Sequence, residues 1–226
     1  MIKKFALSLM ASMSVACVAQ AGDNSPYYGR VDGGIVIAED TSFSSSATQY
    51  GVTVNATGNI ERKAGYTISG AVGRHMNNLV ALELEAGYSK FDYDKVTGNL
   101  TASAGGTNYV VNGSADIDGS IQTVTAIANA IFTPLGNKKS RLSPFVGLGI
   151  GAVYSKDTID SIGTLQVNGS ESDTNLIANA IVGLDYAINK NTYVGAKYRY
   201  LWANTGQNGF DDMKAHTLTA NVTFNF

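Results

Sequence analysis

The end of the chain, residues 214–226, alternates strictly between apolar and polar positions. One face carries His216, Leu218, Ala220, Val222, Phe224 and Phe226, and the other carries Ala215, Thr217, Thr219, Asn221, Thr223 and Asn225. A period of two is typical of a β-strand with one apolar and one polar face. Such a strand, ending on an aromatic residue, indicates a closed transmembrane β-barrel whose last strand pairs with its first.

The same alternation predicts seven further strands. They span residues 27–38, 66–73, 80–89, 121–132, 144–154, 175–188 and 192–202. The clearest is 80–89, where Glu83 and Glu85 alternate with leucines. Carboxylates on one face and leucines on the other do not suit the core of a soluble sandwich. They suit a barrel wall with lipid outside and a polar lumen inside. The alternation is weakest in 121–132, where isoleucines also occupy the inner face.

The connections between these predicted strands alternate between short turns and long polar stretches. The turns are 74–78, 133–142 and 189–191, and the stretches interpreted as loops are about 39–63, 91–119, 155–173 and 203–213. Short turns at one end and long loops at the other are typical of outer-membrane barrels. We therefore predict an all-β, eight-stranded antiparallel up-and-down transmembrane β-barrel with both termini on the periplasmic side.

Residues 1–21 have the features of a signal peptide, which leaves 22–226 as the barrel domain. Two lysines precede an apolar stretch, and Ala19 and Ala21 occupy the small positions of a cleavage site. A lipoprotein leader with Cys17 as the lipidated residue is the alternative, but residues 14–17 match that motif poorly. Cleavage after Ala21 would leave no cysteine, which excludes a disulfide framework and thiol chemistry in the mature chain.

Composition narrows the class of protein further. Only 15% of the 226 residues are charged, and no stretch after the leader approaches 18 consecutive apolar residues, so a helical membrane span is excluded. Removing Lys3 and Lys4 lowers the basic count from 16 to 14 against 18 acidic residues, a net charge of about −4. The sequence has no basic patch, which excludes nucleic acid as a partner.

Four segments link the chain to a known family. They are residues 81–88, residues 143–151, Tyr198-Arg-Tyr200 and the aromatic C-terminus. With them the mature chain resembles the OmpA-like, opacity-type eight-stranded outer-membrane barrels, a porin-related family that includes adhesins, porin-like proteins and surface antigens. The resemblance implies the outer membrane of a Gram-negative bacterium and a monomer without a cofactor. The partners it implies are membrane lipid, lipopolysaccharide, the insertion machinery and a host surface or matrix ligand.

Seven charged residues lie on inward faces of the predicted strands. They are Arg30, Asp32, Glu83, Glu85, Asp185, Lys197 and Arg199. Two of the predicted strands, 80–89 and 192–202, face each other across a narrow lumen, so we expect Glu83 and Glu85 to pair with Lys197 and Arg199. Because buried charges are tolerated when paired, the set is interpreted as a plug. A gate or ion path is the alternative.

Two other motifs suggest chemistry only weakly. The glycines at 147, 149 and 151 lack the spacing of a nucleotide-binding loop, and they are better explained as space for bulky neighbours such as Tyr193 or for the ionic residues. His75 falls in a turn, and His216 falls on the outer face near the extracellular rim. Lipid A deacylases of barrel type use a His-x-Ser pair, which His216-Thr-Leu218 does not match, so neither catalytic nor metal-binding residues are expected.

The remaining aromatic and charged side chains are unevenly distributed between the faces of the strands and between the turns and the loops. Outward aromatic residues near strand ends predict two interfacial girdles, and resemblance to the family marks Phe224 and Phe226 as the assembly signal read by the insertion machinery. The turns carry basic residues, among them Lys138 and Lys139, whereas the long loops carry most of the acids. Divalent cations could bridge such an acidic rim to anionic surfaces. We expect a non-enzymatic surface protein that displays its loops for adhesion and envelope integrity. A narrow channel for small solutes and a lipid A-modifying enzyme are the alternatives.

Overall fold

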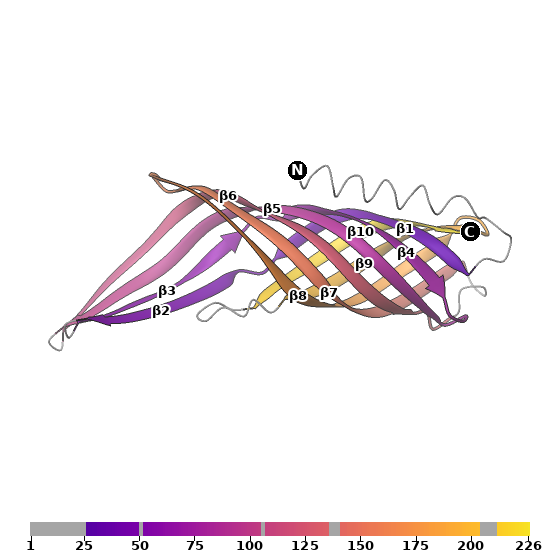
Figure 1. Ribbon diagram of the computed structural model, residues 1–226, viewed down its shortest axis with the longest axis horizontal. Coiled ribbons are helices and arrows are strands. Elements are labelled where there is room, and N and C mark those ends of the chain that lie inside the picture. Colours follow the sequence, from indigo (N-terminus) through magenta and orange to yellow (C-terminus); the bar gives the residue numbers. More distant parts are fainter. Residues whose placement is uncertain (1–25, 50–51, 105–106, 136–140, 204–211) are drawn as a thin grey trace.

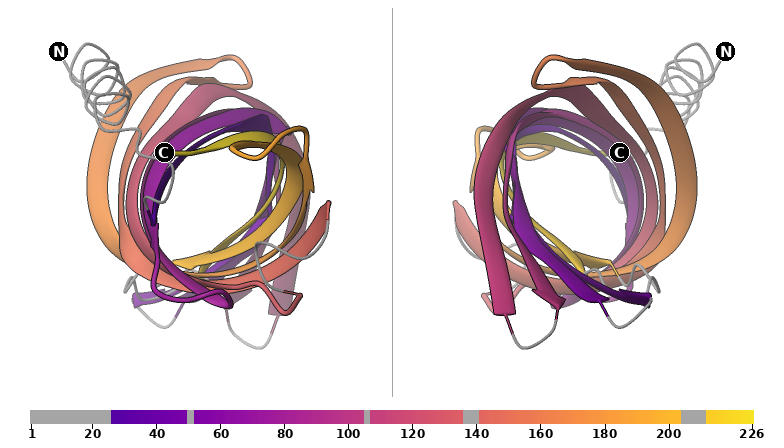
Figure 2. Two further views of the ribbon diagram at one scale, coloured as in Figure 1. Left: turned by 90° about the vertical axis from the view of Figure 1, so that its right-hand side faces the viewer. Right: turned by 90° about the vertical axis from the view of Figure 1, so that its left-hand side faces the viewer.

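The chain forms a closed β-barrel. A computed structural model describes residues 26–49, 52–104, 107–135, 141–203 and 212–226. Its strands are β1 (Tyr27–Ala38), β2 (Thr41–Gln49), β3 (Val52–Arg62), β4 (Gly65–His75), β5 (Val80–Ala104), β6 (Thr107–Phe132), β7 (Leu142–Ile162), β8 (Leu165–Ala187), β9 (Thr192–Ala203) and β10 (Met213–Asn225). Eight of them form the ring β1-β4-β5-β6-β7-β8-β9-β10, which confirms the predicted fold class (Figures 1 and 2). Within the described ranges, no helix is long and apolar enough to cross a membrane.

The last strand closes the ring against the first, as its pattern predicts. β10 pairs with β1 without interruption from Tyr28 opposite Asn225 to Ala38 opposite Ala215. On its other side β10 pairs with β9 over its whole length. Closure of this kind removes the two free edges that an open sheet would expose.

The pairing register is staggered around the barrel. Starting at Arg30, the paired residues are Ala71, Glu85, Ile127, Gly151, Ile177, Ala203 and Met213. Met213 lies two residues before Ala215, the partner of Ala38, so one circuit ends roughly ten residues beyond Arg30. The strands are therefore strongly tilted, and side chains at one depth in the lumen come from different positions along their strands.

The prediction of long irregular loops is wrong for three of the four polar stretches. Residues 41–49 and 52–62 form the hairpin β2-β3, and β5 to β8 continue far beyond the ring. We call the four-stranded extension of β2, β3, residues 95–104 of β5 and residues 107–116 of β6 the blade, which tapers to the left in Figure 1. Serine, threonine and asparagine made these stretches look like loops, yet residues 52–60 alternate with a period of two, as strands do.

Register shifts occur where the strands leave the ring toward the blade. They fall between Ile60 and Arg62 of β3, Asp92 and Lys95 of β5, and Asp118 and Gly119 of β6. A bulge adds a residue to one strand and bends it. A fourth shift, between Ile159 and Ser161 of β7, lies beside the tip of the β7-β8 hairpin.

The barrel is apolar outside and polar inside. Leu148, Ile150 and Leu176 are 70%, 73% and 78% exposed on the outer face, while ionic side chains are buried in the lumen. This reverses the arrangement of a soluble protein and fits a lipid environment. Outward aromatic residues form two bands. Tyr27, Phe132, Tyr186 and Phe224 lie near the turns, and Tyr66, Tyr88, Tyr154, Tyr198, Tyr200 and Trp202 lie toward the extensions.

Some predicted features lie outside the described residues. These are the signal peptide 1–21 with Ala19 and Ala21, the leader cysteine Cys17, Lys138 and Lys139 in a turn, and nearly all of the stretch 203–213.

Candidate functional site: an ionic layer in the lumen

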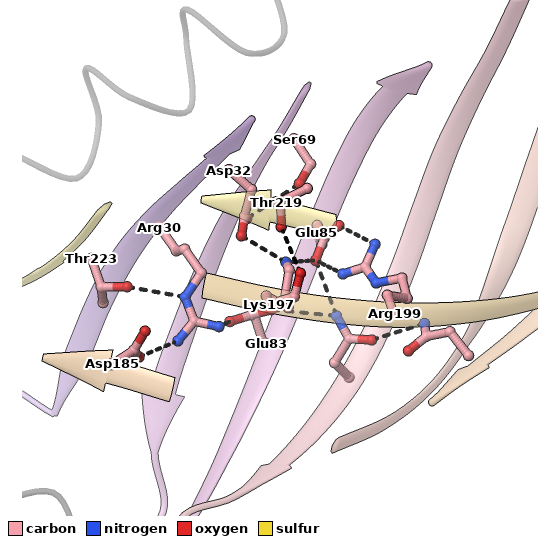
Figure 3. Close-up of polar contacts among 12 residues, drawn as sticks. Arg30, Asp32, Ser69, Glu83, Glu85, Asp185, Lys197, Arg199, Thr219 and Thr223 are labelled. Atoms are coloured by element: carbon pink, nitrogen blue, oxygen red, sulfur yellow. Dashed lines mark hydrogen bonds and ion pairs between the residues drawn. The ribbon is translucent and has the colours of Figure 1, made fainter. Parts of the chain in front are cut away.

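All seven inward charges predicted from the sequence lie in the lumen, and all are buried. They come from four strands: Arg30 and Asp32 from β1, Glu83 and Glu85 from β5, Asp185 from β8, and Lys197 and Arg199 from β9 (Figure 3). Strict alternation along each strand directs these side chains inward. The barrel therefore brings together charges that are up to 169 positions apart in the sequence, Arg30 and Arg199 being the most distant.

One half of the layer is centred on Glu85. Arg199 donates two parallel hydrogen bonds to its carboxylate, one of them from Nη1 to Oε1 at 2.6 Å. Lys197 Nζ lies 3.5 Å from Glu85 Oε2 and 2.8 Å from Asp32 Oδ1. Ser69 adds a hydrogen bond of 3.2 Å to Asp32. Glu85 thus contacts both cations of β9, as predicted.

The other half is centred on Arg30. Its Nη2 lies 3.1 Å from Asp185 Oδ2, its Nη1 lies 3.5 Å from Glu83 Oε2, and its Nε donates to Thr223 Oγ1 at 3.0 Å. Tyr28 also donates to Glu83 at 3.1 Å. The predicted pairing of Glu83 with Lys197 or Arg199 is therefore wrong.

The stagger of the strands explains this correction. In a tilted ring, residues at the same distance from their strand ends lie at different depths in the lumen. Glu83 consequently lies on the Arg30 side of the layer, while Glu85, two residues further along β5, reaches the β9 cations.

Two asparagines join the halves. Asn129 Nδ2 lies 3.3 Å from Glu83 Oε1 and 3.4 Å from Glu85 Oε2, and its own Oδ1 accepts a hydrogen bond of 3.1 Å from Asn179. Alternation in the predicted strands 121–132 and 175–188 places both asparagines on inward faces, but it does not predict their bridging role.

Apolar layers cover the ionic layer at both ends. On the turn side lie Tyr28, Ala81, Ile131, Phe145 and Ile181, and the Arg30 guanidinium stacks 4.8 Å from the centre of the Phe145 ring. On the blade side lie two further clusters: Val36, Ala38, Phe91, Tyr93, Ile117, Ile121 and Ala215, and Ile127, Val153, Ile177 and Ala203. The cavity recorded between Arg30, Phe145 and Asp185 measures about 30 Å³, room for about one water molecule.

Inward glycines provide the space that this packing needs. A Cβ on Gly149 would collide with the Asn129 and Asn179 side chains, and one on Gly147 would collide with Ile131. Gly149 leaves room for Asn129 and Asn179, and Asn129 contacts the two glutamates of the ionic layer. The atoms nearest to a Cβ on Gly147, Gly149 or Gly151 belong to β6 and β8, and the expectation for Tyr193 stays a prediction.

Comparison with known proteins gives the family. The outer membrane protein beta-barrel domain family matches residues 5–226. The chain belongs to this family. It is therefore a bacterial outer-membrane protein, and by the usual orientation of such barrels the short turns face the periplasm and the blade faces the exterior. No curated protein matches the chain.

Several solved structures are similar to this outer-membrane barrel. Neisserial surface protein A is 17% identical, with 89% of this chain and 98% of that chain covered and a TM-score of 0.49. Ail of Yersinia pestis, in complex with the heparin analogue sucrose octasulfate, is 16% identical over 88% and 99% of the chains, with a TM-score of 0.44. The outer membrane protease OmpT of Escherichia coli is 9% identical over 92% and 99%, with a TM-score of 0.46.

Above the membrane, polar residues line the mouth of the outer-membrane barrel. Arg62 Nη1 donates hydrogen bonds of 2.8 Å to the Glu39 carbonyl and to Thr41 Oγ1. Burial raises the pKa of Tyr93 to about 12, and it lowers the pKa of Arg62. Burial also raises the pKa of Asp157, which Arg62 partly opposes. Tyr93 belongs to the apolar cluster of the blade side, and Arg62 lies close enough to Tyr93 and Asp157 to interact with both electrostatically.

The two histidines have structural partners. His75 ends β4, and its ring lies 4.8 Å from that of Tyr28. His216 lies on the outer face, as predicted, with Nδ1 2.7 Å from the Tyr198 hydroxyl and Nε2 3.0 Å from Glu39 Oε1. Both ring nitrogens of His216 are thus engaged. Among the described residues, no group of three or more histidine, cysteine or acidic side chains could hold a metal ion.

Proposed function

We propose that this outer-membrane barrel is a non-enzymatic surface protein whose lumen is a structural plug and whose blade makes contacts outside the cell. The observation that carries the proposal is the combination of a filled lumen with strands that continue well beyond the membrane. The ionic layer lies between apolar layers, so an ion entering from either side would first meet buried hydrocarbon. Among the described residues, β2, β3 and the extensions of β5 to β8 form β-sheet beyond the ring, a rigid support for surface contacts.

A narrow channel is the second candidate, and the packing argues against it. An eight-stranded ring leaves little space beyond its own side chains. Here that space is occupied by paired charges, two asparagines and the rings of Tyr28 and Phe145. Opening a path would require separating several buried ion pairs, each costly to break.

A lipid-modifying enzyme is the third candidate. The histidine best placed to meet lipid is His216, and its ring nitrogens contact the Tyr198 hydroxyl and the Glu39 carboxylate. The His-x-Ser pair of barrel-type deacylases is missing here, because Leu218 stands where the serine would be. The contacts support an interfacial role that fixes the end of β1 against β9 and β10.

The partners of this function are lipid, lipopolysaccharide, the insertion machinery and a ligand on a host surface or matrix. A blade deletion tests the last of these. Replacing residues 41–60 and 96–115 by short turns should leave the ring intact, because their pairing partners lie within the blade. Bacteria carrying this variant should insert it normally yet lose attachment to host cells and matrix proteins. Unchanged attachment would contradict the surface-contact function, and altered membrane lipid would favour the enzyme.

A further inference from the structure

A trough crosses the four strands of the blade. Three consecutive residues of each strand line it: 42–44 of β2, 57–59 of β3, 97–99 of β5 and 112–114 of β6. It has a volume of about 980 Å³. The register places Phe43, Gly58, Gly98 and Gly113 in one line across the strands, so the trough follows this row from edge to edge.

The position of the Phe43 ring shows which face of the blade carries the walls of the trough. The Phe43 ring occupies the position that a Cβ on Gly58 would need, so the ring covers the Cβ side of the row. That side is continuous with the lumen, because Ile60 and Val96, two residues along β3 and β5, pack on the apolar cluster of the mouth. Alternation sends the flanking side chains to the opposite face, away from the barrel axis.

The walls consist of small uncharged groups that form hydrogen bonds. Their residues are Ser42, Ser44, Thr57, Asn59, Thr97, Asn99, Asn112 and Ser114. All are exposed except Thr97, which is half-buried. Within the described part of the chain none of the eight side chains is recorded in a hydrogen bond with another protein group, so their donors and acceptors face solvent. The charged pair of Lys95 and Glu61, 3.4 Å apart, lies outside the trough.

We propose that this trough is a binding site for neutral oligosaccharides. Each carboxamide offers two donors and an acceptor, and each hydroxyl offers both functions, which matches the mixed donors and acceptors of sugar hydroxyl groups. A carboxylated or sulfated sugar would call for arginine or lysine, and the trough has neither. Three inter-strand spacings give a length of about 14 Å, enough for a short oligosaccharide.

This inference rests on the proposed surface function and specifies its ligand class. The same chemistry occurs in the neutral sugars of the bacterium's own lipopolysaccharide and in neutral glycans of another cell. The first would hold the blade down against its own membrane surface, and the second would attach the bacterium to another surface. Binding of purified oligosaccharides from each source distinguishes the two possibilities.

The test uses the full-length protein in lipid nanodiscs. Binding is measured to neutral O-polysaccharide fragments, to neutral host-type oligosaccharides, and to their sialylated or sulfated counterparts. Neutral sugars of one source should bind with little dependence on salt, because no charge pairing is involved. The variant Asn59→Ala/Asn99→Ala should weaken binding at least tenfold. Asn55→Ala, on the same strand and face but outside the trough, should bind as wild type does.

Three results would overturn the inference: no neutral sugar binds, only charged sugars bind in a salt-sensitive manner, or the double variant binds as well as Asn55→Ala does. The surface function has a separate readout. If host-type sugars are the ones that bind, attachment that survives Asn59→Ala/Asn99→Ala but is lost on blade deletion contradicts the sugar site alone. Attachment that survives both contradicts the surface function.

Discussion

The ammonium group of Lys197 lies 2.8 Å from the carboxylate of Asp32 in the middle of the lumen, and the two side chains are 1% and 0% exposed. Lys197 also lies 3.5 Å from Glu85. One cation on β9 thus serves two buried carboxylates, one on β1 and one on β5. Because removing one partner leaves the others as uncompensated buried charges, this contact makes the layer sensitive to single substitutions.

Lys197→Met is expected to destabilise the barrel strongly. The free energy of unfolding, measured by urea titration in lipid vesicles, should fall by about 3 kcal/mol, since Asp32 loses its cation. Adding Asp32→Asn removes the unpaired charge and should recover part of the loss. Lys190→Met, the same change in an exposed turn, should stay within about 0.5 kcal/mol of wild type. If Lys197→Met alone were as stable as Lys190→Met, the assigned ion pair between Lys197 and Asp32 would be contradicted.

Gly149→Ala tests the packing around the bridging asparagines. A Cβ there would collide with Asn129 Oδ1 and lie 2.7 Å from Asn179 Nδ2, so the hydrogen bond between these residues must break. We expect the free energy of unfolding to fall by about 2 kcal/mol. Gly70→Ala is the control, because its Cβ would meet nothing within 4 Å. Equal stability of the two variants would show that the asparagine bridge is dispensable.

Asp157→Asn should change how the β7-β8 extension responds to pH. Burial raises the pKa of Asp157, so the folded form holds its proton more tightly than the unfolded chain does. The resulting stability is present below the unfolded pKa of about 3.9 and is lost as pH rises through the raised folded value. At pH 7 the variant's amides should therefore exchange hydrogen more slowly than those of wild type, after correction for intrinsic rates. Near pH 4 the difference should shrink.

Asp160→Asn provides the comparison for that experiment. Asp160 lies in the same extension but is exposed. Its variant should show the same protection as wild type at both pH values. If Asp157→Asn shows less protection than wild type at pH 7, then the attraction to Arg62 outweighs the cost of burying the carboxylate.

Deleting Phe226 should impair assembly more than stability. The Phe226 amide donates to the Tyr27 carbonyl at 3.1 Å, and its ring lies 3.6 Å from the Cβ position of Gly29, at the seam between β1 and β10. With Phe224 it also forms the predicted assembly signal. We expect less folded protein in outer-membrane fractions, measured by the mobility shift of folded barrels on gels. Asn225→Ala is the control, and normal insertion of the deletion variant would refute the prediction.

Much of the ring is predictable because its lipid and lumen faces differ so sharply. The bounds of β1 and the closure of β10 on β1 follow from alternation alone. The inward placement of Glu85 opposite Lys197 and Arg199 also follows, since only their relative positions on opposite walls matter.

What could not be predicted depends on geometry that no single strand encodes. The partner of Glu83 is set by the stagger accumulated around the whole ring. The blade was missed because both of its faces meet water, so the contrast between apolar and polar positions is weak there. The runs from Val52 to Ile60 and from Val96 to Ala104 kept a clear alternation, but their polar composition concealed it.

Ion conductance in planar lipid bilayers shows whether the lumen is a plug. A plugged wild-type barrel should give no sustained open-channel current. Arg199→Ala should produce at most brief, noisy openings, because Phe91 and Ile121 on one side and Phe145 and Ile131 on the other still close the lumen. A stable, large current through the wild type, unchanged by Arg199→Ala, would contradict the plug.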